Sequence, residues 1–246
     1  MVHDASSRDL HTREKAVAER SSLPKISVPL LRWFTWYSRR YIRRHFHSLR
    51  VSQNNLPAIP SNIPLVVFTN HASWWDPLVG LVLKSEFFPQ RRLFSPIDSV
   101  ALQRYKMFLK LGFFGIEQND RRGAVQFLRN AESILSQSDS VLALTPQSRF
   151  CDVRQRPLQF RPGIGHLAAR VEHAAFLPMA VEYVYWEERL PEILVRFGPV
   201  INVTREKNST HNAQEWTPLF EEKLSETQDA LAMESQTRDP ANFKIL

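Results

Sequence analysis

Short, almost continuously apolar segments alternate with amphipathic helical segments over much of this 246-residue chain. The apolar segments include residues 65–69 (LVVFT) and 141–145 (VLALT), which are long enough for strands but too short for ordinary helices. Strands that are apolar on both faces are typical of parallel sheets covered by helices on both sides. The alternation therefore predicts a single α/β domain with a mostly parallel central sheet flanked by helices.

The same patterns place the remaining elements. Further strands are expected at residues 91–96, 113–117, 176–183 and 192–197. Helices are expected at residues 78–84, 100–111, 123–137, 163–172 and 212–235. The polar residues 146–162 are expected to form a long loop between a strand and a helix.

Composition divides the chain into three segments. Residues 1–56 contain a polar lead-in and a basic, aromatic, amphipathic helix, which we expect to dock on a membrane. Residues 57–205 are expected to form the α/β domain, and residues 206–246 a polar helical tail. Before the first strand of the domain, any helix is interrupted by three prolines, Pro57, Pro60 and Pro64.

The first helical segment, residues 28–50, carries two contrasting faces. Apolar and aromatic residues recur at helical spacing on one side, at Leu30, Trp33, Phe34, Tyr37 and Tyr41. Arginines fall on the other side, at Arg32, Arg39, Arg43 and Arg50, and no acidic residue occurs in the segment. A basic face opposite an aromatic face is typical of helices that lie in a membrane interface. The alternative is that the aromatic stripe packs on the domain.

The chain is basic and rich in aromatic residues. Its 32 lysines and arginines exceed its 25 acidic residues, which gives a formal net charge of +7. By charge alone, an anionic membrane surface, a nucleic acid or a phosphorylated metabolite could be the partner. No stretch approaches the roughly 18–20 apolar residues of a spanning helix, and the charged residues between Asp4 and Glu14 are untypical of a signal peptide. We therefore expect a cytoplasmic protein that associates peripherally with the inner face of the membrane.

Several chemistries lose support because their motifs are missing. The single cysteine, Cys151, cannot form a disulfide within the chain or a cysteine-based zinc cluster, and no metal is expected. The sequence contains no G-x-x-x-x-G-K-[ST] loop, no G-x-G-x-x-G turn, no G-x-S-x-G elbow and no H-E-x-x-H pair. Nucleotide-triphosphate, hydride-transfer and serine-hydrolase functions are accordingly disfavoured.

The strongest candidate for chemistry is the segment 70–77 (NHASWWDP), which directly follows the first buried strand. Catalytic groups of α/β proteins lie at the carboxyl ends of parallel strands. A turn into the next helix can bring Asp76 to His71, so that the carboxylate accepts one imidazole N–H and the other nitrogen serves as a general base. Asp76 before Pro77 is also typical of a helix N-cap, alone or as a capping pair with Ser73.

This segment resembles the first motif of the glycerolipid acyltransferase family, which includes glycerol-3-phosphate and lysophosphatidic acid acyltransferases. The resemblance extends from about residue 65 to residue 197, in the order of the family's motifs. It implies that His71 deprotonates the acceptor hydroxyl, that Asp76 orients His71, and that the hydroxyl attacks a thioester carbonyl directly. The implied donor is acyl-coenzyme A or acyl carrier protein, and no other cofactor is implied.

Later segments resemble the other motifs of the family. An apolar strand with glycine, residues 112–116 (GFFGI), precedes Arg121 and Arg122 as in the second motif. Residues 177–181 (LPMAV) resemble the fourth motif, an apolar strand with proline. Arg161 resembles the basic residue that follows the third motif.

The third motif departs from the family's phenylalanine–proline–glutamate–glycine–threonine–arginine. In residues 145–150 (TPQSRF), Gln147 stands in place of the glutamate and Ser148 in place of the glycine. A neutral amide leaves the acceptor open and suits a less conventional lipid hydroxyl. The resemblance implies that arginines of the second and third motifs hold an acceptor phosphate, which a guanidinium fork matches. The substrate-binding residues expected in this way are Arg121, Arg122, Gln147, Ser148, Arg149 and Arg161.

Together, the residues and the resemblance predict a membrane-surface O-acyltransferase similar to 1-acylglycerol-3-phosphate acyltransferases. It would transfer a fatty acyl group from an acyl thioester to a hydroxyl of a lysophospholipid or a related lipid. Its partners would be the thioester donor, the lipid acceptor and an anionic membrane surface. Two alternatives stay open: a catalytically weak lipid-binding protein of the same fold, and a basic nucleic-acid-binding protein, although no nucleic-acid-binding signature is present.

Overall fold

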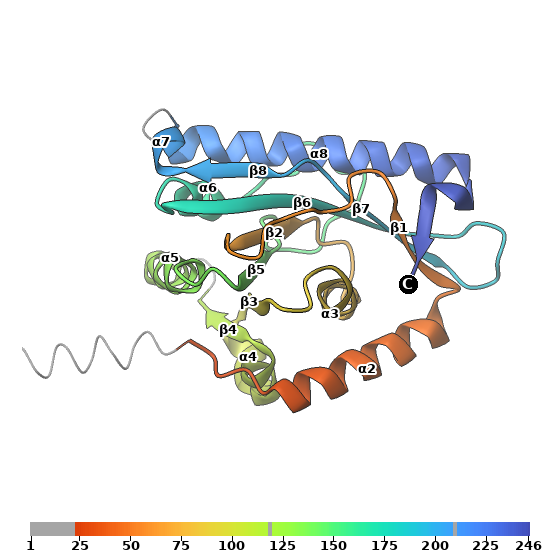
Figure 1. Cartoon of the computed structure of the whole chain (residues 1–246), viewed down its shortest axis with the longest axis horizontal. Coiled ribbons are helices and arrows are strands. Elements are labelled where there is room, and N and C mark those ends of the chain that lie inside the picture. Colours follow the sequence, from red (N-terminus) through yellow and green to blue (C-terminus); the bar gives the residue numbers. More distant parts are fainter. Residues whose placement is uncertain (1–22, 118–119, 209–210) are drawn as a thin grey trace, which may run out of the picture.

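The computed structural model of this protein describes residues 23–117, 120–208 and 211–246. The polar lead-in expected before the first helix falls on residues 1–22 and so lies outside the described residues. Within the described residues a nine-stranded sheet runs through the molecule in the order β4-β3-β5-β2-β6-β7-β1-β9, with β8 beside β6 (Figure 1). This architecture confirms the predicted α/β fold.

Near-continuous apolar runs form the central strands, as their sequences predict. The strands are β1 (Ser48–Ser52), β2 (Leu65–Thr69), β3 (Arg92–Asp98), β4 (Phe113–Ile116), β5 (Ser140–Leu144), β6 (His173–Val184), β7 (Glu192–Phe197), β8 (Ile201–Thr204) and β9 (Phe243–Ile245). Strands β4, β3, β5, β2 and β6 are parallel to one another. Strands β7 and β8 both run antiparallel to β6, on different parts of that long strand.

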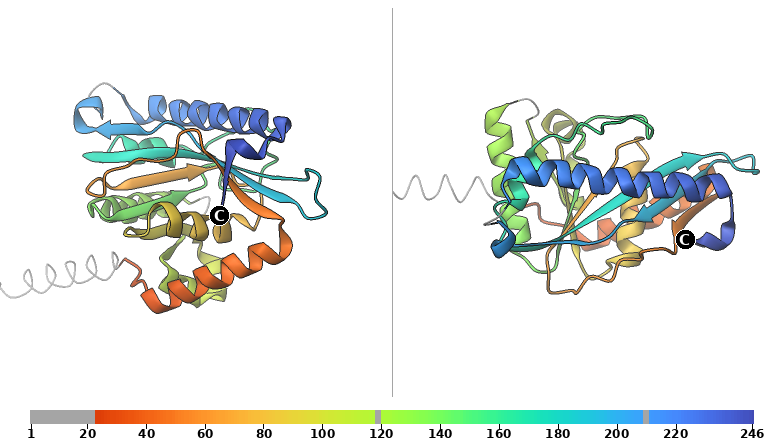
Figure 2. Two further views of the ribbon diagram at one scale, coloured as in Figure 1. Left: turned by 45° about the vertical axis from the view of Figure 1, so that its right-hand side comes forward. Right: turned by 90° about the horizontal axis from the view of Figure 1, so that it is seen from above.

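Helices cover both faces of the sheet. They are α2 (Val28–His45), α3 (Asp76–Phe87), α4 (Ser99–Arg104), α5 (Arg121–Leu135), α6 (Gly163–Ala168), α7 (Arg205–Asn208) and α8 (Ala213–Thr237), with short 3₁₀ helices η1 (Lys106–Leu111) and η2 (Pro240–Asn242). Helix α8 lies lengthwise over one face, and α2 lies on the opposite side of the molecule (Figures 1 and 2).

Two hydrophobic clusters on opposite faces of the sheet form most of the core. In β2, Leu65 and Val67 belong to the cluster with α2 and α3, whereas Val66 and Phe68 belong to the cluster with α5, α6 and α8. Burial on both faces explains why the strand sequence does not alternate between polar and apolar residues. Each fully buried Phe or Leu side chain stabilises the fold by about 1.5–3 kcal/mol relative to exposure.

The helix predicted over residues 28–50 ends earlier than expected, at His45. Residues 48–52 instead form β1, which pairs in parallel with β7 and antiparallel with β9. Both partners lie far along the chain, so local periodicity does not reveal this strand. Arg50 is therefore not part of the helix's basic face; it is buried and forms an ion pair with Glu192, with Nε 3.2 Å from the carboxylate.

Other boundaries also differ from the sequence-based expectations. The helix predicted at residues 100–111 is divided into α4 and η1, and the helix predicted at residues 163–172 ends at Ala168. Strands β8 and β9 were not predicted, because neither is long enough to show a clear pattern. Since β1 and β9 lie outside the range 57–205, the sheet extends beyond the limits expected for the α/β domain.

Substitutions at two glycines, Gly165 in α6 and Gly80 in α3, can test how closely α6 packs against α8. A Cβ atom added to Gly165 in α6 would overlap the Thr217 hydroxyl and the Ala213 carbonyl oxygen of α8, whereas one added to Gly80 in α3 would meet nothing within 4 Å. We expect Gly165→Ala to lower the free energy of unfolding by about 1–3 kcal/mol through overpacking. We expect Gly80→Ala to raise it by about 0.5–1 kcal/mol, because alanine is the better helix former. Urea denaturation of the two variants measures both values, and equal effects would contradict this close α6–α8 contact.

Candidate active site

Just beyond the end of β2, a side chain continues the pairing of this strand with β6. The buried Asn70 amide accepts a hydrogen bond from the Val181 N–H and donates one to the Val181 carbonyl, each at 2.9 Å. This pair of bonds imitates a strand ladder one residue beyond β2. It thereby holds the next residue, His71, at the carboxyl edge of the parallel strands, where α/β proteins place ligands and catalytic groups.

His71 and Asp76 meet as their spacing predicts. The His71 Nδ1 atom lies 2.7 Å from Asp76 Oδ2, which also accepts the Ser73 backbone N–H at 3.1 Å. Helix α3 begins at Asp76, with Trp75 as the residue before it. The expectation that Asp76 is the N-cap is wrong, because Trp75 occupies that position and Asp76 is the first helical residue. The Asp76 carboxylate binds the imidazole and also the Ser73 N–H of the preceding turn.

Tyr183, which was not among the site residues predicted from the sequence, joins His71 and Asp76 in one cluster. The Tyr183 hydroxyl, near the end of β6, donates a 2.6 Å hydrogen bond to Asp76 Oδ1. Burial raises the pKa of Tyr183 well above its ordinary value, and the adjacent Asp76 carboxylate raises it further. The phenol therefore stays protonated and donates. Because Tyr183 lies 107 residues after Asp76, only the β2–β6 pairing could have placed it here.

One nitrogen of His71 remains available for chemistry. Nδ1 is occupied by Asp76, and within the described residues Nε2 has no hydrogen-bond partner. The His71 side chain is 21% exposed, with the exposed ring of Phe150 against it at a centroid distance of 4.3 Å. Fixing Nδ1 as the donor leaves Nε2 as the acceptor, which is the arrangement of a general base.

Gln147 lies in the loop of residues 145–162 (the third-motif loop), which begins with the segment that resembles the third motif. It is buried, its Oε1 accepts the His71 backbone N–H at 3.1 Å, and its Nε2 donates to the Leu158 carbonyl at 3.3 Å. Its amide thus links the loop backbone at Leu158 to the backbone of His71 and helps to fix the position of that residue. Its neighbour Ser148 has a φ of 54°, in the left-handed region where glycine is favoured.

A largely apolar cavity of about 460 Å³ opens beside this loop. Three of the predicted substrate-binding residues line it, Arg121, Ser148 and Arg161. Its apolar wall comes from β3–β5, α5 and α6, and includes Pro96, Ile116, Phe127, Leu128, Leu144 and Ile164. A cavity with an apolar wall and two guanidinium groups can accept an amphipathic anion.

The remaining two predicted arginines do not line this cavity. Arg149 is exposed and its Nη2 donates to the Gln159 side chain at 2.5 Å. Arg122 is exposed at the start of α5, next to Arg121. The structure thus separates the six predicted substrate-binding residues into three at the cavity, one inside the loop and two on the surface.

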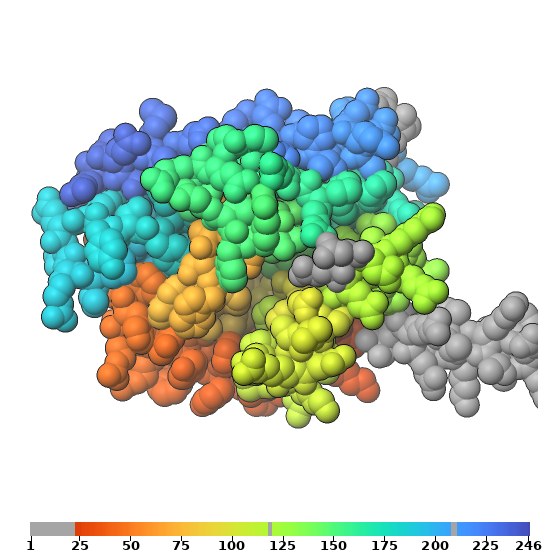
Figure 3. Space-filling view, turned by 180° about the vertical axis from the view of Figure 1, so that it is seen from behind, coloured from red at the N-terminus to blue at the C-terminus, as the bar shows by residue number. Residues whose placement is uncertain are grey.

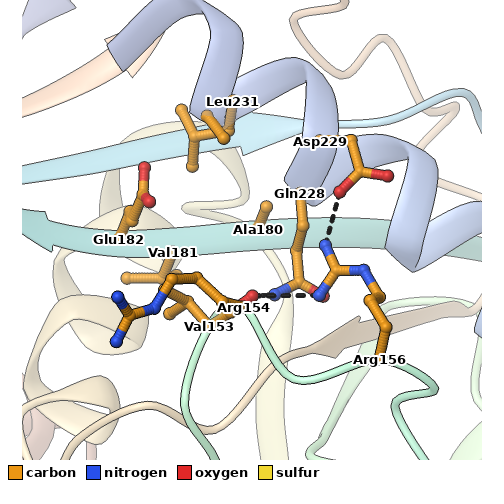
Figure 4. Close-up of a pocket in the computed structure, with 10 residues that line it drawn as sticks. Val153, Arg154, Arg156, Ala180, Val181, Glu182, Gln228, Asp229 and Leu231 are labelled. Atoms are coloured by element: carbon orange, nitrogen blue, oxygen red, sulfur yellow. Dashed lines mark hydrogen bonds and ion pairs between the residues drawn. The ribbon is translucent and has the colours of Figure 1, made fainter. Parts of the chain in front are cut away.

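A smaller cavity of about 210 Å³ lies on the α8 side of β6 (Figure 4). There Arg156 of the loop forms an ion pair with Asp229 of α8 at 2.5 Å, and Gln228 Nε2 donates to the Val153 carbonyl at 3.1 Å. Burial raises the pKa of Glu182, which also lines this cavity. These contacts fasten the loop that carries Gln147 and Phe150 to the longest helix.

Within the described part of the chain, no cluster of histidine, cysteine and acidic side chains could hold a metal ion. Among the same residues, no helix combines the length and the apolar character that crossing a membrane requires.

The role of Gln147 can be tested by Gln147→Glu. A carboxylate cannot donate to the Leu158 carbonyl, so we expect a loss of about 1–3 kcal/mol in the free energy of unfolding at neutral pH. Burial against a carbonyl should raise the pKa of the new carboxyl, and its protonated form can donate again. The loss should therefore shrink as the pH falls below that pKa. Thermal unfolding against pH measures this, with the exposed Gln103→Glu as control; a loss independent of pH would contradict the assigned bond.

Comparisons with known proteins were made for the whole chain. No family model matches it, and a search of curated proteins found no match. Among solved structures, its fold is similar to that of the 1-acyl-sn-glycerophosphate (LPA) acyltransferase PlsC from Thermotoga maritima. The two chains are 13% identical, with a TM-score of 0.54 over 82% of this chain and 79% of that chain. At this identity the likeness concerns the fold.

Proposed function

We propose that this protein is an O-acyltransferase that moves a fatty acyl group from an acyl thioester to a hydroxyl of a lysophospholipid or a related lipid. The observation that carries the proposal is the His71–Asp76–Tyr183 chain of hydrogen bonds. It orients one imidazole nitrogen and leaves the other without a hydrogen-bond partner among the residues that the structure describes. The fold's similarity to an LPA acyltransferase supports the same reaction class.

In the proposed reaction, His71 Nε2 takes the proton of the acceptor hydroxyl as its oxygen attacks the thioester carbonyl. The Asp76 carboxylate stabilises the imidazolium that forms. The tetrahedral intermediate collapses with cleavage of the carbon–sulfur bond, and the leaving thiolate takes the proton back from His71. An ester and a free thiol result, so neither an acyl-enzyme nor a metal ion is required.

The cavity beside the third-motif loop is the proposed substrate site. Its apolar wall suits an acyl chain, and Arg121 and Arg161 suit a phosphate of the lipid acceptor or of the thioester donor. None of His71, Asp76 and Tyr183 lines the cavity. The loop links the two places, because Pro146 and Ser148 line the cavity while Gln147 between them bonds to the His71 backbone. The donor is acyl-coenzyme A or acyl carrier protein.

We further propose that the protein works at an anionic membrane surface, on its cytoplasmic side. Helix α2 buries Ile42 and Ser38 against α3, while Trp33 and Trp36 are 52% and 59% exposed. Four exposed arginines lie on the same helix, at Arg32, Arg40, Arg43 and Arg44, and the last three line one surface hollow together with Trp36. Exposed indoles among arginines are typical of interfacial helices, and each arginine near an anionic bilayer adds about 1 kcal/mol of attraction.

The reaction is tested by replacing the base. We expect His71→Ala to lower the rate of acyl transfer by about 10²–10⁴-fold, because the hydroxyl loses its proton acceptor. Transfer from labelled acyl-coenzyme A to extracted lipids measures the rate, and mass spectrometry of the product identifies the acceptor. The exposed His173→Ala in β6 is the matched control and should keep the wild-type rate.

Two outcomes would contradict this proposal. Undiminished transfer by His71→Ala would exclude His71 as the base. Absence of transfer by the wild-type protein with every acceptor and both donors would instead favour a lipid-binding protein with this fold.

Tyr183 is a positioning residue in this mechanism, and Tyr183→Phe tests that role. Loss of its hydrogen bond leaves more negative charge on Asp76, which stabilises the imidazolium form of His71. We expect the acidic limb of the kcat/KM profile to move to higher pH, with a loss of about tenfold in kcat. Tyr185→Phe, at a side chain that is 68% exposed, is the control. A lower rate with an unshifted profile would mean that Tyr183 only supports the fold.

A further inference from the structure

We propose that the α4–η1 segment, residues 99–111, is a second surface that binds an anionic lipid bilayer, beside α2. The inference rests on the proposed function, because a lipid acceptor must reach the cavity from a bilayer. It assigns a role to a segment that neither the catalytic cluster nor the core accounts for.

The first observation is that this segment is apolar but not buried. None of the α4 residues is buried, and in η1 only Leu111 is buried. Four large apolar side chains are exposed, with Val100 at 74%, Tyr105 at 49%, Leu109 at 42% and Met107 at 40%. Exposed apolar side chains gathered on one short connection mark an interaction surface.

The second observation is the charge of the same segment. Between Asp98 and Glu117 the chain contains no acidic residue, but it contains Arg104, Lys106 and Lys110. All three cations are exposed, and the Arg104 guanidinium lies 5.4 Å from the ring centre of Tyr105. Cations of one sign among exposed apolar groups complement a surface that is negative at its headgroups and apolar beneath them.

The third observation is continuity with α2. The Ser27 N–H, just before α2, donates to the Lys110 carbonyl of η1 at 2.8 Å. The α4–η1 segment and α2 lie together along the side of the molecule opposite α8 (Figures 1 and 3). The exposed Trp33 and Trp36 of α2 and the exposed residues of α4–η1 can therefore contact one bilayer together.

The strands on either side of the α4–η1 segment also line the proposed substrate cavity. Strand β3 supplies Pro96 to the cavity and leads directly into α4, and β4 returns from η1 to supply Ile116. A bilayer contact at α4–η1 thus lies on the same connection as one wall of the proposed substrate cavity. Two separated contacts, here and at α2, would also fix the orientation of the protein on the membrane.

The experiment compares vesicle binding by five full-length proteins, the wild type and four variants. It uses flotation with phosphatidylcholine vesicles and with equimolar phosphatidylcholine–phosphatidylglycerol vesicles. The test variant is Val100→Ser/Met107→Ser/Leu109→Ser, which keeps Tyr105 and the Phe108 ring that contacts Phe113. The reference variant is Trp33→Ser/Trp36→Ser on α2. The matched control is Met233→Ser/Tyr185→Ser, at side chains that are 70% and 68% exposed elsewhere on the surface.

We expect wild type and control to bind the anionic vesicles more tightly than the neutral ones. We expect the α4–η1 variant to bind the anionic vesicles about tenfold or more weakly, with an unchanged unfolding midpoint. In a separate variant, Arg104→Gln/Lys106→Gln should lose binding to the anionic vesicles only.

Binding at the wild-type level by both α4–η1 variants would overturn the inference. So would a wild-type protein that binds neither vesicle type, a result that would point to a protein partner for this surface. Neither result depends on catalysis. Acyl transfer with detergent-dispersed lipids tests the proposed reaction independently, so the two proposals can fail separately.

Discussion

Strand β6 is the constraint on which the rest of the structure depends. Along one edge it pairs with β2, and along the other it pairs first with β8 and then with β7. Asn70 extends the β2 pairing to Val181, two residues before Tyr183. The strand that holds the sheet together therefore also delivers a hydrogen-bond donor to Asp76. A slip of one residue in this pairing would turn Tyr183 to the other face of the sheet and remove it from the cluster.

Local patterns predicted the parts of the fold that depend on local forces. The apolar runs at β2 and β5 and the amphipathic α5 have strong short-range signals, and the structure has them within two residues of their expected limits. Strand β1 was mistaken for helix because its identity depends on partners from β7 and β9, far along the chain. The same reason hid Tyr183, whose contact with Asp76 exists only after β6 has paired with β2.

The third-motif loop shows the limit of reading residue roles from a motif. Gln147 is one of the residues predicted to bind substrate, and in that prediction its neutral amide leaves the identity of the lipid acceptor open. In the structure both ends of that amide bond to backbone groups, the His71 N–H and the Leu158 carbonyl. An amide supplies one acceptor and one donor there, which a carboxylate cannot do. The hydrogen bonds of the loop therefore explain the glutamine at this position, and Gln147 does not identify the lipid that accepts the acyl group.

Helix α2 and the segment that carries Asp76 are joined by direct aromatic packing. The C-terminal end of α2 contacts Trp75, with ring-centre distances of 5.3 Å from Tyr41 and 4.9 Å from Phe46, and Trp75 directly precedes Asp76. Phe46 also lies 5.7 Å from the ring of Tyr183, whose hydroxyl donates to the Asp76 carboxylate. Because Ile42 and Phe46 are core residues and β1 follows at once, α2 is not a detachable anchor. Packing contacts thus connect the helix proposed to meet the membrane with the residue directly before Asp76, the carboxylate that binds the proposed base.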